Sequence, residues 1–291
     1  MSKSLSRSRE KVHVKLRFLD AVVAAALAIL LAAGCNTNGG ESAGADQSQS
    51  DAGSGSRDLP QGAEPVRLDP KIFTTRIDNP YWPMDPGTRW TYNEIDQEGA
   101  KLKVVVTVSD QTKKIANGVT ARVVRDTVTG DGVIVEDTFD WYAQDKEGNI
   151  WYLGENTAEF ENGKLKTKEG SFEAGVDGAK PGIIVPADPH DGMQYRQEYY
   201  KGVAEDNGEV LSTDEMVQVP AGHFDEALLT KDTITIEPNV LEYKLYAKGV
   251  GPLLTLGVSG GPGSREELIK LDTASQKEMR EAGTAPLGSA G

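Results

Sequence analysis

Apolar residues recur at every second position over much of the chain between residues 80 and 271. In one such run, Leu102, Val104, Val106 and Val108 share a single face. This period of two predicts β-strands that bury one face each. No stretch of a dozen residues has the 3.6-residue period of an amphipathic helix. The sequence therefore predicts an all-β, mainly antiparallel protein.

Short turn sequences separate these runs. The pairs Asn117-Gly118, Asp131-Gly132, Asn162-Gly163 and Asn207-Gly208 consist of residues that tolerate a positive φ angle. We therefore expect a tight hairpin at each pair.

The alternation also predicts which residues of each strand point to the apolar face. In the long run that begins at residue 133, this face would carry Val133, Val135, Phe139, Trp141 and Ala143. The polar residues between them are expected to face water.

Three segments recur in the same order about 105 residues later. The matched pairs are 85–92 with 191–196, 125–129 with 231–235, and 139–143 with 243–247. This predicts a curved sheet or barrel-like unit built from two similar halves, about 78–183 and 184–272. The alternative is that β-hairpins resemble one another in composition.

The N-terminal segment has the three parts of an export signal, which are a basic stretch, an apolar stretch over residues 21–33, and small residues before Cys35. Thirteen apolar residues are too few for a membrane span, which needs about 20. Ala-Ala-Gly before the only cysteine resembles a bacterial lipoprotein signal, except that Ala32 stands where leucine is usual and Leu31 lies one place earlier. The resemblance implies lipidation of Cys35, with palmitate-like acyl chains as the membrane anchor.

These observations predict four parts of the chain. Residues 1–34 are a lipoprotein signal peptide and residues 35–63, rich in Gly, Ser and Asp, are a disordered tether. Residues 64–272 are the duplicated β domain, and residues 273–291 are a flexible tail. The mature protein is expected at the cell membrane or envelope, lipid-anchored and facing outside the cytoplasm.

Charge limits the possible partners. The whole chain has a net charge of −14, and the leader holds six of the 31 Lys and Arg and two of the 45 Asp and Glu. The remaining 25 basic and 43 acidic residues give the mature protein a net charge of −18. Such a surface repels nucleic acid, so no nucleic-acid partner is expected.

Several motifs resemble a group of uncharacterised bacterial exported proteins and lipoproteins. They are the segments 78–83 (Asp-Asn-Pro-Tyr-Trp-Pro), 86–90 (Pro-Gly-Thr-Arg-Trp) and 139–145. The segments 217–224 and 246–251 are similar to a wider set of exported curved-sheet proteins. The resemblance implies an extracytoplasmic location and this fold, and it implies no chemistry.

No catalytic or metal-binding residue is predicted, and no cofactor is expected. His190 lies in an Asp-Pro-His-Asp-Gly turn without convergent partners. The segment 145–149 contains calcium-type ligands but lacks an acid at the twelfth loop position, where Asn156 stands. Acids that would suit glycoside hydrolysis are Glu136, Asp137, Asp140, Glu155 and Glu159.

Aromatic residues on the predicted strands are the candidate ligand-facing residues. They are Trp90, Tyr92, Phe139, Trp141, Trp151, Tyr195 and Tyr243. They would either fill a core or line a cavity, and a cavity above about 300 Å³ would favour a ligand carrier. Trp82 is expected to plug one end of the sheet.

The favoured function is a non-catalytic binding module for an apolar small molecule, a glycan or an envelope protein. The alternatives are an envelope glycan hydrolase with a carboxylate pair and a passive surface or structural lipoprotein.

Overall fold

A computed structural model of the protein describes residues 59–258 and 263–289. Sixteen strands form one antiparallel sheet, and thirteen of them follow the path β10-β12-β13-β14-β15-β16-β2-β3-β4-β5-β6-β9-β11. The strands are β1 (Phe73–Thr74), β2 (Thr88–Ile95), β3 (Lys101–Lys114), β4 (Thr120–Gly130), β5 (Val133–Asp145), β6 (Ile150–Glu161), β7 (Lys164–Thr167), β8 (Phe172–Glu173), β9 (Lys180–Val185), β10 (Gln194–Arg196), β11 (Glu198–Tyr199), β12 (Asp206–Val219), β13 (Gly222–Ile234), β14 (Glu237–Ala247), β15 (Gly251–Gly257) and β16 (Ser264–Thr273), with the 3-10 helix η1 (Pro70–Ile72) before β1 and helix α1 (Gln276–Thr284) after β16.

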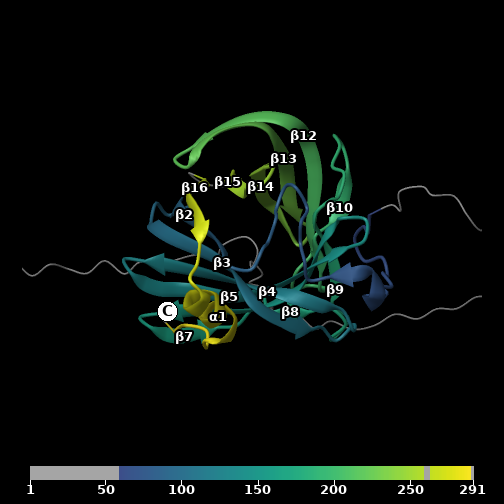
Figure 1. The fold of residues 1–291 in the computed structure, drawn as a ribbon, viewed down its shortest axis with the longest axis horizontal. Helices are drawn as coiled ribbons and strands as arrows, with labels where there is room; N and C mark the ends of the chain where they lie inside the picture. The colour runs from purple at the N-terminus through teal and green to yellow at the C-terminus, as the bar shows by residue number, and fades with distance from the viewer. Residues whose placement is uncertain (1–58, 259–262, 290–291) are drawn as a thin grey trace, which may run out of the picture. The chain divides into compact units, whose positions relative to one another are not determined.

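The path of strands returns almost to its starting point. Strands β10 and β11 lie at its two ends, and only Gln197 separates them in the chain. Figure 1 shows β12 and β13 arching over the layer that contains β3, β4 and β5. The sheet is therefore a nearly closed barrel, which confirms the all-β antiparallel prediction. The duplication into two halves stays a prediction.

Two predicted hairpins have the geometry that their residues favour. Asp131 and Gly132 have φ angles of 52° and 77°, and Asn162 and Gly163 have 54° and 73°. Two successive positive φ angles are typical of a type I′ turn, whose twist matches that of the flanking strands.

The hairpin predicted at Asn207-Gly208 is not formed, because both residues lie inside β12. A Cβ atom at Gly208 would lie 2.5 Å from the ring of Tyr195, which packs over this position from β10. The glycine is therefore required by packing rather than by a turn.

The folded region begins before residue 64. The backbone N–H of Arg196 donates to the Pro60 carbonyl at 2.7 Å, and its buried guanidinium donates to the carbonyls of Gly62 (2.6 Å) and Glu64 (2.8 Å). Residues 60–62, predicted as part of the tether, are thus bound to β10. The rest of that tether up to residue 58, with Cys35, lies outside the described residues.

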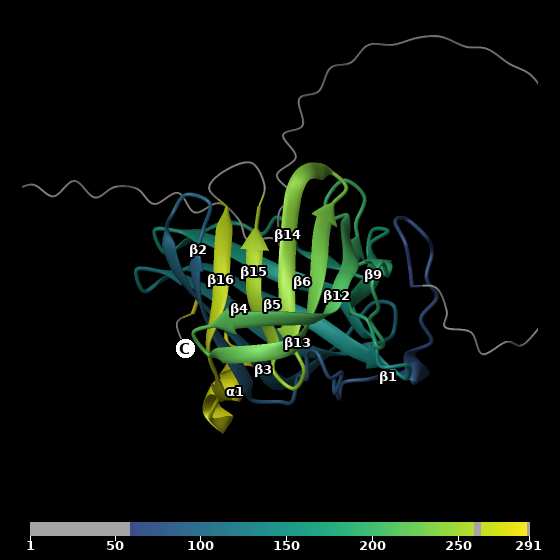
Figure 2. The ribbon, with the colours of Figure 1, turned by 90° about the horizontal axis from the view of Figure 1, so that it is seen from above.

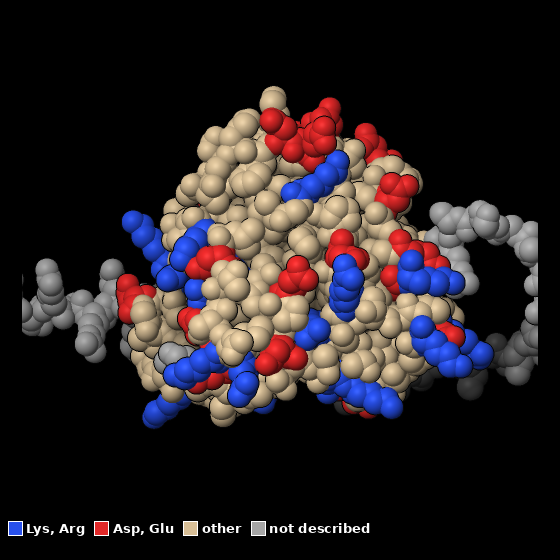
Figure 3. Space-filling view, viewed as in Figure 1, with Lys and Arg blue, Asp and Glu red and all other residues tan. Residues whose placement is uncertain are grey.

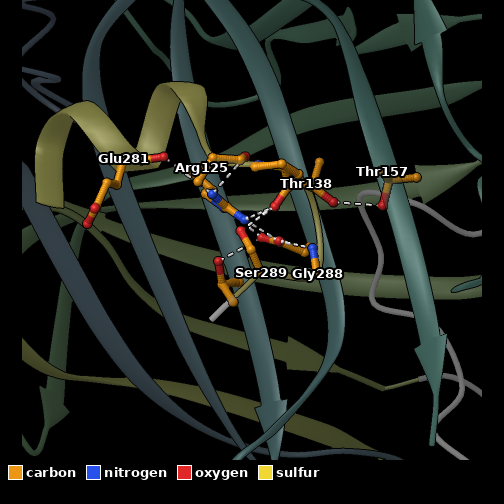
Figure 4. A network of polar contacts seen from close by, with 10 residues as sticks. Arg125, Thr138, Thr157, Glu281, Gly288 and Ser289 are labelled. Carbon is orange, nitrogen blue, oxygen red and sulfur yellow. Dashed lines mark hydrogen bonds and ion pairs between the residues drawn. The ribbon is translucent and has the colours of Figure 1, made fainter. Parts of the chain in front are cut away.

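The C-terminal segment differs from the flexible tail expected over residues 273–291. Helix α1 begins with a capping box between Ser275 and Glu278, and it packs against β3 and β4 (Figure 2). The guanidinium of Arg125 donates to the carbonyls of Glu281, Ala285 and Pro286, as Figure 4 shows in part. The guanidinium thus holds the segment through its backbone, and the single buried residue of helix α1 is Ala282.

Neither described helix has the length and apolar character needed to cross a bilayer.

Candidate binding site in the barrel interior

The barrel contains a partly open cavity of about 150 Å³. Its wall combines four aromatic residues with a large set of carboxylates. The aromatic residues are Trp82, Tyr92, Tyr142 and Tyr246, and the acidic residues are Glu94, Asp96, Asp126, Glu136, Asp140, Glu242 and Glu266. We call these seven the wall carboxylates.

Strand β5 shows how the sheet places polar groups inside. Its residues Glu136, Thr138, Asp140 and Tyr142 occupy alternate positions and all line the cavity. Phe139 lies between them on the opposite face, where the guanidinium of Arg125 is 5.3 Å from its ring centroid. The polar face of β5 therefore lies on the concave side of the sheet. The expectation from the sequence was wrong on this point, because it placed the polar residues of this strand toward water and the face with Phe139 and Trp141 inside.

The candidate aromatic residues divide between the two faces. Trp90, Tyr92 and Tyr195 point into the barrel, and among them Tyr92 lines the cavity. The other four do not line it. They are Phe139, Trp141, Trp151 and Tyr243. Phe139, Trp141 and Tyr243 alternate along their strands with residues that line the cavity, so their side chains point outward. Trp151 pairs with Ala143, which also faces outward.

An aromatic cluster closes one end of the cavity. The ring centroid of Trp82 lies 5.5 Å from that of Tyr142, 6.1 Å from Tyr246 and 6.4 Å from Trp90. Trp82 is 8% exposed, and its indole N–H has no hydrogen-bond partner among the described residues. That Trp82 plugs one end of the sheet stays a prediction.

The opposite end of the cavity is acidic. On β2 and on β14 the acid and the aromatic residue occupy different positions along the strand. Glu94 follows Tyr92 toward the β2–β3 turn, and on the antiparallel β14 Glu242 precedes Tyr246, so both acids lie toward the same end of the barrel. Asp96 follows in that turn, 6% exposed. Its Oδ1 accepts from the backbone N–H groups of Glu98 (2.9 Å) and Ala100 (2.8 Å), and its buried Oδ2 has no partner among the described residues.

Acids dominate this wall. On the outer face shown in Figure 3, acidic and basic side chains are interspersed except for a group of acids at the top. The cavity wall, in contrast, has seven carboxylates and one basic residue, Lys244. Glu94 and Glu266 are even direct cross-strand neighbours in the register of β2 and β16, an arrangement that costs stability when both are ionised.

Lys244 is held between acids of two strands. Its Nζ lies 2.9 Å from Asp232 Oδ2 and 3.5 Å from Glu242 Oε2. Burial acts to lower the pKa of Lys244, but Asp232 and Glu242 raise it by more, so the pKa lies above its usual range. The ammonium is therefore charged at neutral pH although it is buried.

Asp206 belongs to the same group of side chains. Burial raises the pKa of Asp206 to about 7, Lys244 acts in the opposite direction, and Asp232 and Glu242 add to the increase. The interior thus contains a carboxyl that titrates near neutral pH.

A buried phenol bridges two acids beside the cavity. Tyr152 Oη lies 2.9 Å from Asp140 Oδ1 and 2.7 Å from Glu155 Oε2. Burial, with the charges of Glu155 and Asp140, raises the pKa of Tyr152 well above its usual value. The hydroxyl therefore stays protonated and orients the two acids.

The histidines lie away from the cavity. His190 is exposed in its turn, and His223 is 3.2 Å from the exposed Asp225. The segment 145–149 forms a hairpin turn, in which Asp145 accepts from the Asn149 backbone at 2.9 Å and from Trp151 Nε1 at 2.7 Å. The described residues contain no group of three or more His, Cys, Asp or Glu that could hold a metal ion.

Sequence reasoning missed Tyr142, Tyr246 and most of the wall carboxylates. The available signal was the period-two run Glu136, Thr138, Asp140, Tyr142, in which an aromatic residue shares a face with acids. Such a face is expected to meet water, and only the curvature of the sheet places it inside.

No protein-family description and no functionally curated protein matches the chain. Three solved structures are similar. A protein from Bacteroides fragilis, inferred to be exported and with a YmcC-like fold, is 17% identical, covers 66% of this chain and 99% of its own, and has a TM-score of 0.41. A protein from Parabacteroides distasonis, inferred to be a lipoprotein, is 15% identical with a TM-score of 0.35, over 66% of this chain and 98% of its own.

The third structure is a β-barrel-like protein of the domain of unknown function DUF1849 from Brucella abortus. It is 14% identical with a TM-score of 0.32, over 65% of this chain and 98% of its own.

Proposed function

We propose that this protein is a lipoprotein held at the cell envelope through Cys35, and that its barrel binds a small molecule without transforming it chemically. The observation that carries the proposal is the interior cavity, with aromatic rings at one end and carboxylates at the other. Concave sites with apolar walls and a few convergent polar groups are the usual form of a small-molecule site.

The cavity limits the size of the ligand. Its volume of about 150 Å³ is below the value of about 300 Å³ that we set from the sequence as favouring a ligand carrier. A protein cavity of about 150 Å³ is large enough for benzene. The ligand is therefore a molecule, or part of a molecule, of about that size.

The sequence supports the location. Cys35 follows an export signal, and the Gly- and Ser-rich segment after it provides a tether. A flexible chain of about 25 residues spans on the order of 30 Å, so the barrel would stand away from the membrane surface.

A glycan hydrolase has less support. Its two carboxylates must flank a sugar polymer, which needs an open groove. The acids of this barrel line a small interior cavity instead. A passive structural role predicts that the cavity has no specific ligand, and the following experiment distinguishes it from binding.

Native mass spectrometry of the full-length protein, purified from cells in a neutral detergent, tests the proposal. We expect an added mass, beyond that of the lipidated chain, that is lost on denaturation. Two neighbouring residues of β3 give a matched pair of variants, since Val106 lines the cavity and Val105 lies on the other face. The added mass should persist in Val105→Phe and disappear in Val106→Phe, and a protein that is repeatedly free of ligand would refute the binding proposal.

A further inference from the structure

We propose that the ligand of this cavity is a small organic cation, a protonated amine that carries an apolar part of about the size of benzene. The charge would lie at the acidic end, beside Asp96, and the apolar part on the aromatic cluster. This inference rests on the proposed binding function and adds the chemical class of the ligand.

The charge of the wall favours a cation. Seven carboxylates face one ammonium across about 150 Å³. A site lined by more acids than bases has a negative potential, which favours a positively charged ligand over a neutral or anionic one.

Asp96 offers a specific contact. Its Oδ1 is used by the two backbone N–H groups of its turn. Its Oδ2 is buried and has no partner among the described residues, and Asp96 is one of the residues that line the cavity. A carboxylate oxygen in this position is an acceptor for an N–H donor of a positively charged ligand.

The aromatic residues distinguish an organic cation from a bare metal ion. Trp82, Tyr92, Tyr142 and Tyr246 line the same cavity as the acids. Aromatic faces attract cations through the ring quadrupole and also bury apolar groups. A metal ion would use the acids alone, whereas an amine with an apolar substituent uses both parts of the wall.

Lys244 shows that the wall accommodates an ammonium group. Its Nζ is buried in contact with Asp232 at 2.9 Å, and the surrounding acids keep it charged. Glu242, which lies 3.5 Å from this ammonium, also lines the cavity that a ligand amine would enter.

Isothermal titration calorimetry with the full-length protein in a neutral detergent tests the inference with probes of matched size. The probes are benzylammonium, the neutral benzyl alcohol, the anionic benzoate, and calcium chloride. We expect benzylammonium to bind at least about tenfold more tightly than benzyl alcohol, and benzoate not to bind, because one hydrogen bond to a charged group is typically worth a factor of ten or more.

Asp96→Asn is the informative variant, because the amide retains Oδ1 for the turn and removes the charge at Oδ2. It should weaken benzylammonium binding about tenfold without changing benzyl alcohol binding. Asp131→Asn is the matched control, since Asp131 lies exposed in the β4–β5 hairpin and outside the cavity wall. Thermal unfolding of both variants checks that the fold is retained.

Three results would overturn the inference. Equal binding of benzyl alcohol and benzylammonium would leave the binding function in place and refute the charge requirement. Calcium binding that excludes benzylammonium would assign the acids to a metal ion. Absence of benzylammonium binding, in a protein that carries a neutral molecule from cells, would refute the cationic class while supporting the binding function.

Discussion

Arg125 on β4 and Asp137 on β5 form a buried ion pair on the outer face of the barrel. Arg125 Nε donates to Asp137 Oδ1 at 2.8 Å, and the two side chains are 8% and 0% exposed. Asp137 Oδ2 also accepts from the backbone N–H of Gly288 at 2.7 Å. The pair therefore joins the C-terminal segment to the barrel, as the contacts in Figure 4 illustrate.

Asp137→Asn should destabilise the protein by about 3–5 kcal/mol, because it leaves the Arg125 guanidinium buried without a compensating charge. Urea denaturation of the full-length chain measures this loss. Glu281→Gln is a suitable control, since the Lys277–Glu281 contact is exposed and 3.7 Å long, and it should change stability by less than about 0.5 kcal/mol. Similar losses in both variants would show that the buried pair does not hold the C-terminal segment.

Trp82 and Trp90 allow a comparison of two neighbouring indoles. Trp90 Nε1 donates to the Val250 carbonyl at 2.7 Å, whereas Trp82 Nε1 has no partner among the described residues. Replacement by phenylalanine removes similar ring area in both cases, but only Trp90→Phe also removes a hydrogen bond. Trp90→Phe should therefore cost about 1 kcal/mol more than Trp82→Phe, as measured by the free energy of unfolding in urea.

Equal losses in the two tryptophan variants would contradict this assignment. A larger loss of unfolding free energy for Trp82→Phe than for Trp90→Phe would show that the Trp82 N–H stabilises the fold, although it has no hydrogen-bond partner among the described residues.

Asp206 predicts how stability depends on pH. Burial raises its pKa from 3.8 to about 7 in the folded protein, so the folded state binds this proton more tightly than the unfolded state. The stabilisation by the bound proton is fully present below about pH 4 and is lost as the pH rises through about 7. Asp206→Asn should remove this dependence.

Urea unfolding at about pH 4.5, 6 and 8 tests the expectation for Asp206. Wild-type stability should fall relative to Asp206→Asn over this range, by a few kcal/mol in order of magnitude. Asp191→Asn, at an exposed turn, serves as the control for loss of one negative charge. A constant difference between wild type and Asp206→Asn would refute the raised pKa.

Cys35→Ser tests the anchor that the sequence predicts. Labelled palmitate should enter the wild type and not the variant, because the serine hydroxyl does not replace the thiol as the acylation site. The variant should also be released from the membrane fraction in salt-washed preparations. Ser42→Ala, in the predicted tether, is the control and should behave as the wild type, and firm membrane retention of Cys35→Ser would refute the lipoprotein assignment.

Much of the barrel could be predicted from local patterns. The alternation at residues 102–108 identified β3, and Asp131-Gly132 identified the β4–β5 hairpin, because both signals depend on neighbouring residues only. The hairpin predicted at Asn207-Gly208 was wrong for the opposite reason. Gly208 is required because the ring of Tyr195, on another strand, packs against it, and a local pattern does not reveal that contact.

The site was harder to predict because curvature is a property of the whole sheet. The alternation in β5 separates Phe139 and Trp141 from Asp140 and Tyr142 correctly, but it does not say which set lies on the concave side. Helix α1 was assigned to a flexible tail because its sequence has almost no apolar face. Arg125 holds this segment through backbone carbonyls, which no sequence pattern marks.

The pairing of β16 with β2 bears on how the protein matures. The first long strand of the barrel, β2, finds one of its two neighbours in the last strand, with Tyr92 opposite Leu268. If the chain is exported from its N-terminus, as we propose, the barrel cannot close until nearly all of the chain has been translocated. Until then β2 would keep an unpaired strand edge, which is a site where other chains can pair and aggregate.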